Sequence, residues 1–171
     1  RGSAQTRGET GLSADLTVPA LAPLAALENV DMRGNATLHV TARQQGPKLA
    51  VTADGRMHTQ GAALPARLLG GDASLTLTAE LDGSDLTASR IQLKGAAIAA
   101  DIEGSLRRSV LDYRLALDPN DVSRLAAPLR GTLELRGTVT GPMGQAALSA
   151  SGAAALATKG FSRQRIVLEM Q

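Results

Sequence analysis

The sequence has no cysteine and almost no aromatic residues: one tyrosine, one phenylalanine and no tryptophan in 171 residues. The lack of cysteine excludes disulfides, thiolate metal sites and cysteine nucleophiles. The lack of aromatic rings leaves nucleic-acid bases with almost nothing to stack on. It also argues against an outer-membrane barrel, because such barrels carry aromatic girdles at both membrane interfaces.

Long apolar runs and basic clusters are missing as well. No uninterrupted apolar stretch approaches the ~18 residues of a transmembrane helix. The net charge is +2, and no basic cluster is longer than Arg107-Arg108, so nucleic acid is not an expected partner. The sequence starts at Arg1 without an initiator methionine or a signal sequence, and it stops inside an alternating run at 166–171. We therefore expect a segment of a longer protein.

What the sequence does have is a strict alternation of apolar and polar residues. In 73–82, alanine and leucine occupy the odd positions, and serine, threonine and acidic residues occupy the even ones. Successive side chains of a strand point to opposite faces, so each such strand has one apolar and one polar face. This pattern predicts an antiparallel sheet that is solvated on one side. The alternating segments are 36–43, 48–56, 73–82, 96–107, 111–118 and 132–140.

Turn residues and short helices punctuate the strands. Gln44-Gln45-Gly46-Pro47, Asp82-Gly83 and 141–144 predict turns. Three Leu/Ala-rich segments, at 19–27, 62–69 and 119–127, predict brief helices, the last one with Asp118 as its N-cap before Pro119. The order suggests loose repeats at about 19–61, 62–118 and 119–171. We predict a mostly β fold: one segment of an elongated, curled antiparallel sheet, open and solenoid-like, with short connecting helices.

The apolar side of this sheet is unusually poor in large side chains. A sheet with one apolar face must cover it. Two interpretations stay open: two sheets approach closely around small residues, or a curled sheet keeps an apolar groove that a flexible ligand such as an acyl chain fills. The small inward positions are Ala73, Ala79, Gly95, Ala96, Ala100, Gly104, Gly137, Ala146, Ala150 and Gly152.

One stretch resembles a known family. Residues 125–141 read Leu-Ala-Ala-Pro-Leu-Arg-Gly-Thr-Leu-Glu-Leu-Arg-Gly-Thr-Val-Thr-Gly, a short Leu/Ala/Pro segment that leads into glycine-spaced alternating strands. This stretch is similar to the repeating phrase of the TamB family (translocation and assembly module) in the AsmA-like superfamily. Residues 145–156 and 166–170 continue the pattern, and 23–40 and 65–81 resemble weaker copies, so the resemblance covers most of the chain from about residue 12.

The resemblance implies a large periplasmic protein of Gram-negative bacteria, anchored in the inner membrane through a region absent from this sequence. Its fold is the β-taco, a long curled antiparallel sheet with an apolar interior. The implied roles are phospholipid transport between the two membranes and support of outer-membrane protein assembly. The implied partners are phospholipid acyl chains and, through regions outside this chain, an outer-membrane barrel.

On this basis we expect a non-enzymatic segment without cofactor or metal, whose aliphatic side chains line a lipid groove. The main alternative is a structural or adhesive β-repeat domain with a filled core. A hydrolase lacks support, because the sequence shows no nucleophile–base arrangement. The candidate lining residues are Leu38, Val40, Leu75, Leu77, Ile98, Ile102, Leu115, Leu133, Leu135 and Val139.

The remaining polar candidates do not form a site. His39 is expected on the polar face of its strand and His58 in a connection, and neither belongs to a metal-binding motif. Asp118, Asn120 and Asp121 lack the spacing and the closing glutamate of a calcium loop, so helix capping explains them better. Arg163 and Arg165, next to Phe161, predict a solvated strand end rather than a headgroup contact.

Overall fold

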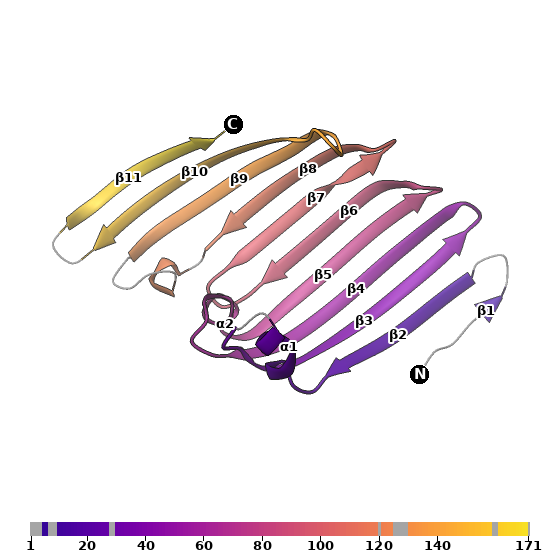
Figure 1. The fold of residues 1–171 in the computed structure, drawn as a ribbon, viewed down its shortest axis with the longest axis horizontal. Coiled ribbons are helices and arrows are strands. Elements are labelled where there is room, and N and C mark those ends of the chain that lie inside the picture. Colours follow the sequence, from indigo (N-terminus) through magenta and orange to yellow (C-terminus); the bar gives the residue numbers. More distant parts are fainter. Residues whose placement is uncertain are drawn as a thin grey trace.

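A computed structural model describes residues 5–6, 10–27, 30–119, 121–124, 130–158 and 161–170. It forms one open, curled antiparallel sheet in which eleven strands follow one another in chain order (Figure 1). The predicted mostly β class is confirmed. The strands are β1 (Gln5–Thr6), β2 (Thr10–Val18), β3 (Arg33–Gln45), β4 (Lys48–Gln60), β5 (Gly71–Asp82), β6 (Asp85–Lys94), β7 (Ala99–Arg107), β8 (Val110–Asp118), β9 (Arg130–Pro142), β10 (Ala147–Thr158) and β11 (Phe161–Met170).

The two ends of the sheet differ. Tight turns join β3 to β4, β5 to β6, β7 to β8 and β9 to β10 at one end, and the helices lie at the other (Figure 1). The helices predicted at 19–27 and 62–69 are confirmed as α1 (Ala22–Leu27) and α2 (Leu64–Leu69). The third segment contains a 3-10 turn, η1 (Val122–Arg124), and the rest of it, at 125–129, lies outside the described residues.

The predicted cap at Asp118 is wrong. Asp118 is the last residue of β8, and its Oδ1 accepts a hydrogen bond from Arg136 Nη1 at 2.7 Å. Asp121 caps the turn instead, because its Oδ1 accepts from the backbone N–H of Ser123 at 3.0 Å. The hydrogen bond from the Ser123 hydroxyl is the main reason that the pKa of Asp121 lies below its usual value, and the bond from the Ser123 backbone lowers it further. Asn120 lies outside the described residues.

Two of the junctions that lead into a strand depend on glycine. Gly34 and Gly131 are the second residues of β3 and β9, with φ of 137° and 134°. A Cβ on Gly34 would meet the carbonyl oxygen of His58, and one on Gly131 would meet that of Ala155. Only glycine adopts this conformation readily. The Arg-Gly pairs at 33–34 and 130–131 therefore mark equivalent junctions.

Strand β6 was not identified from the sequence, because its alternation slips by one residue. In the sequence, apolar residues fall at even positions in its first part, Leu86 and Ala88, and at odd positions in its second, Ile91 and Leu93. The structure has a β-bulge here: Leu86 pairs with Leu81 but Ala88 pairs with Glu80, so Thr87 is the extra residue. A bulge bends its strand and increases the local twist.

Two more local features differ from expectation. The β7–β8 hairpin turns at Arg108 and Ser109, which take φ of 50° and 65°, although such turns favour Asn and Gly. Strand β7 begins at Ala99 rather than at residue 96, because the preceding connection binds α2: the N–H groups of Ala96 and Ala97 donate to the carbonyls of Leu69 and Leu68 at 2.9 and 3.0 Å.

The sheet is a single layer over most of its area. In the described part of the chain, extensive contacts between strands join only neighbours, and the helical segments contact β3, β4 and β9. Close packing of two sheets is therefore not the reason for the many small residues. The buried apolar side chains are few and small: Ala25, Ala53, Ala66, Ala73, Ala97, Val122 and Ala154.

Candidate functional site

One side of the sheet carries a continuous aliphatic surface. Residues that pair directly across antiparallel strands point to the same side, so the register defines three rows of nine residues from β2 to β10, which we call the apolar face. The first row is Leu16, Leu38, Gly55, Leu75, Leu93, Ala100, Leu117, Leu135 and Gly152; the second is Ala14, Val40, Ala53, Leu77, Ile91, Ile102, Leu115, Gly137 and Ala150; the third is Leu12, Ala42, Val51, Ala79, Ser89, Gly104, Tyr113, Val139 and Leu148.

Nine of the ten predicted lining residues lie on this side of the sheet. Leu38, Leu75 and Leu135 belong to the first row, Val40, Leu77, Ile102 and Leu115 to the second, and Val139 to the third. Leu133 pairs with Ala154, one step beyond the first row. Ile98 is the exception, because it lies in the connection between β6 and β7.

Sequence reasoning missed other members of the apolar face. Ile91 and Leu93 follow the bulge of β6, where the alternation slips. Leu12 and Leu16 belong to β2, whose regular alternation of Leu12, Ala14, Leu16 and Val18 could have identified it.

The apolar face is open. Leu12 and Leu16 are 61% and 57% exposed, and most side chains farther in are half-buried by their neighbours. Nine strands at about 4.8 Å and three rows at about 6.8 Å give an area on the order of 800 Å². The largest apolar patch on a soluble monomer is usually about 300–600 Å². An apolar surface of this size indicates an interaction site.

Two glycines of the apolar face, Gly55 and Gly152, are covered by neighbouring leucines. A Cβ on Gly55 would lie 3.3 Å from Leu38 Cδ1 and 3.4 Å from Leu75 Cβ, and one on Gly152 would lie 2.6 Å from Leu135 Cδ2. The leucine side chains thus fill the space that these two glycines leave.

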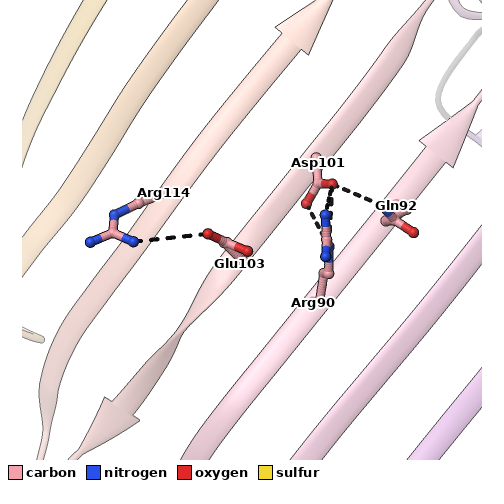
Figure 2. Close-up of polar contacts among 5 residues, drawn as sticks. All are labelled: Arg90, Gln92, Asp101, Glu103 and Arg114. Atoms are coloured by element: carbon pink, nitrogen blue, oxygen red, sulfur yellow. Dashed lines mark hydrogen bonds and ion pairs between the residues drawn. The ribbon is translucent and has the colours of Figure 1, made fainter.

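The opposite face is polar, and hydrogen bonds and ion pairs join charged side chains of its adjacent strands β6, β7 and β8 (Figure 2). Arg90 of β6 donates to both carboxylate oxygens of Asp101 on β7, with Nη2 to Oδ2 at 2.6 Å, and Gln92 donates to Oδ2 at 2.8 Å. The hydrogen bond from Arg90 is the main reason that the pKa of Asp101 is lowered. Arg114 Nη1 lies 3.9 Å from Glu103 Oε1.

One hollow on this polar face, of about 540 Å³, does not resemble a ligand site. It is bordered by Arg90, Asp101, Glu103, Arg114 and Arg136, among others. These charged groups face partners of opposite sign within the chain, and Asp118 binds Arg136 and raises the pKa of that guanidinium. The hollow therefore lacks an unmatched group that would select a ligand.

The histidines also lie on the polar face. His39 Nδ1 is 2.7 Å from Asp15 Oδ1, on the face where it was predicted. The prediction for His58 is wrong: it lies within β4, which continues to Gln60, and its Nδ1 is 2.9 Å from Asp72 Oδ1. Over the described ranges, no group of three His, Asp or Glu side chains is placed to hold a metal ion.

None of the helices in the described part of the chain combines the length and the apolar character that crossing a membrane requires. Comparison of the chain with protein-family models, with curated proteins and with solved structures finds no match.

Proposed function

We propose that this chain is a segment of a periplasmic lipid bridge of the TamB type, which holds phospholipid acyl chains on its apolar face during transport from the inner to the outer membrane. The observation that carries the proposal is the aliphatic surface of β2–β10, over which no second layer lies in the described residues. The resemblance of residues 125–141 to the TamB repeat supports the same proposal.

The chemistry of the apolar face suits a ligand that is held by its tail and moves. Burial of an acyl chain contributes about 0.8 kcal/mol per CH₂. The rows repeat from strand to strand at about 4.8 Å, so a shift by one strand exchanges one set of aliphatic contacts for a similar one. Such a surface would bind an acyl chain and let it slide along the sheet with low energy barriers.

The arrangement in the cell envelope follows from the proposal. The segment would span part of the periplasm, anchored in the inner membrane through another region of the protein. Support of outer-membrane protein assembly, with a barrel partner bound outside this chain, belongs to the same proposal. The role is non-enzymatic, since binding and sliding need no bond to be broken.

Photocrosslinking in cells tests this function. A photoreactive amino acid at Leu77 or Leu135 would lie on the apolar face, whereas one at the neighbouring Thr76 or Glu134 would lie on the polar face. We expect phospholipid adducts from the first pair and none from the second. Equal labelling on both faces would contradict the proposal. Adducts with polypeptide in place of lipid at Leu77 and Leu135 would indicate the alternative, a structural repeat with a filled core.

A further inference from the structure

The apolar face contains a single polar feature. Of the three rows from β2 to β10, every residue is aliphatic or glycine except Ser89 on β6 and Tyr113 on β8. These two residues occupy the same row, separated only by Gly104 of β7. The only hydroxyl groups of the surface therefore lie next to each other.

The two hydroxyls are in contact. Ser89 Oγ is 3.2 Å from Tyr113 Oη and 3.2 Å from the carbonyl oxygen of Gly104. The missing side chain of Gly104 makes this possible: a Cβ there would lie 2.7 Å from Tyr113 Cδ1, so the ring reaches across β7 toward Ser89. Both side chains are half-buried.

The pair can release one donor to a ligand. Each hydroxyl has one proton and can also accept. When Ser89 donates to the Gly104 carbonyl, the Tyr113 proton is used on Ser89. When Ser89 donates to Tyr113 instead, the tyrosine proton is free for an acceptor above the apolar face. Rotation of two hydroxyls is the only change between these states.

The position of Ser89 and Tyr113 on the apolar face indicates which acceptor group of a lipid would reach them. An alkyl chain has no acceptor, but the ester that joins an acyl chain to glycerol has a carbonyl oxygen. The second and first rows extend from the pair toward the helix-bearing end of the sheet over about 14 Å. This length matches an acyl chain, which fills one leaflet, or about 15 Å, of a hydrocarbon core about 30 Å thick.

From these observations we infer that Ser89 and Tyr113 hold the acyl-ester carbonyl of a bound phospholipid, with its acyl chain lying across the second and first rows. The inference rests on the proposed function and adds a fixed point to an otherwise uniform surface. A lipid that slides along the sheet would pause at β6–β8, in one orientation.

The test compares two lipids that differ only in the linkage. A diacyl phosphatidylethanolamine and its dialkyl ether analogue are offered to the protein in mixed micelles, and retention is measured by native mass spectrometry. One hydrogen bond is worth about 0.5–1.5 kcal/mol, so the wild type should retain the ester lipid about two- to tenfold better. Tyr113→Phe keeps the ring and removes the hydroxyl, and it should abolish this preference while retention of the ether lipid is unchanged. Ser149→Ala, on the polar face, is the matched control and should keep the preference.

The outcomes separate the two proposals. Retention of both lipids with equal affinity by the wild type, or an ester preference that persists in Tyr113→Phe, overturns the inference about the hydroxyl pair and leaves the proposed function standing. Retention of neither lipid by the wild type overturns both. Unchanged retention of the ether lipid shows that the Tyr113→Phe variant still has its apolar face.

Discussion

The two faces of this sheet differ in how far their side chains find partners within the chain. On the polar face, three pairs of charged side chains join adjacent strands of β6–β9, among them Arg90 with Asp101 and Arg136 with Asp118. On the apolar face, no described element of the chain covers the three aliphatic rows. The comparison teaches that part of the polar surface is paired within the chain, whereas the three rows of the apolar face are left uncovered by the described residues.

Magnitudes show which face dominates the energetics of binding. Exposed ion pairs of the kind seen on the polar face contribute about 0.2–1 kcal/mol each. An apolar area on the order of 800 Å² corresponds to about 20 kcal/mol when it is fully covered, at ~25 cal/mol per Å². Even partial covering of the apolar face therefore outweighs the ion pairs together.

The largest effect is expected from a charge placed on the apolar face. Leu77 lies in the second row between Ala53 and Ile91, and Thr76, next to it, points to the polar side. An aspartate inside a hydrocarbon layer costs about 3 kcal/mol, so Leu77→Asp should lower phospholipid retention about 100-fold. Thr76→Asp adds the same charge and should leave retention unchanged. Lipid extracted from the purified variants measures this, and equal retention would remove the distinction between the faces.

A smaller effect, on the stability of the fold, is expected when a glycine at the start of a strand is replaced. Gly34→Ala should destabilise the protein by about 1–3 kcal/mol, because φ of 137° is unfavourable for alanine and the new Cβ meets the carbonyl of His58. Gly46, in the β3–β4 turn, has φ of 60° with no atom within 4 Å of a Cβ, so Gly46→Ala should cost only about 1 kcal/mol.

Denaturation midpoints in urea compare the two glycine variants. Equal losses of stability would contradict the importance of the helix-to-strand junction. A similar large loss in Gly34→Ala and Gly131→Ala, with a small loss in Gly46→Ala, would show that the two Arg-Gly junctions are equivalent.

Much of the fold follows from alternation in the sequence, because an antiparallel sheet with one solvated side imposes period two on every strand. The limits of this reasoning are local. The bulge at Thr87 shifts the phase of β6, and the β7–β8 turn uses Arg108 and Ser109, which carry no turn signature. Both features depend on pairing with neighbouring strands, which a single segment does not reveal.

The candidate site was predictable as a set of residues but not as a surface. The alternation of side chains along a strand is enough to place Leu77 and Leu135 on the apolar side of the sheet. The register brings Ser89 and Tyr113 into one row, although they are 24 residues apart in sequence and neither belongs to a motif. Long-range register across three strands is needed to see them together.

On the polar face, removal of one charge should have a modest effect. Asp101→Asn keeps the shape of the side chain but removes the charge that Arg90 and Gln92 bind. We expect a loss of about 0.2–1 kcal/mol in the free energy of unfolding, since solvent still reaches both side chains of the pair, which are 52% and 30% exposed. Phospholipid retention should not change. A loss of retention comparable to that of Leu77→Asp would mean that the two faces act together.

The smallest effect is the pH dependence of the same pair. The pKa of Asp101 is lower in the folded protein than the usual value of about 4, mainly because of the hydrogen bond from Arg90. The stability that the ionised carboxylate contributes is therefore complete above pH ~4 and is lost as the pH falls through the folded pKa.

Asp101→Asn should show less loss of stability than the wild type when the pH is lowered from 5 to 3, and the two proteins should respond alike between pH 7 and 5. Denaturation curves at these pH values measure the difference, and parallel losses below pH 4 would exclude a contribution from this carboxylate. Because the three rows of the apolar face contain no Asp, Glu or His, lipid retention should be the same at pH 7 and pH 5.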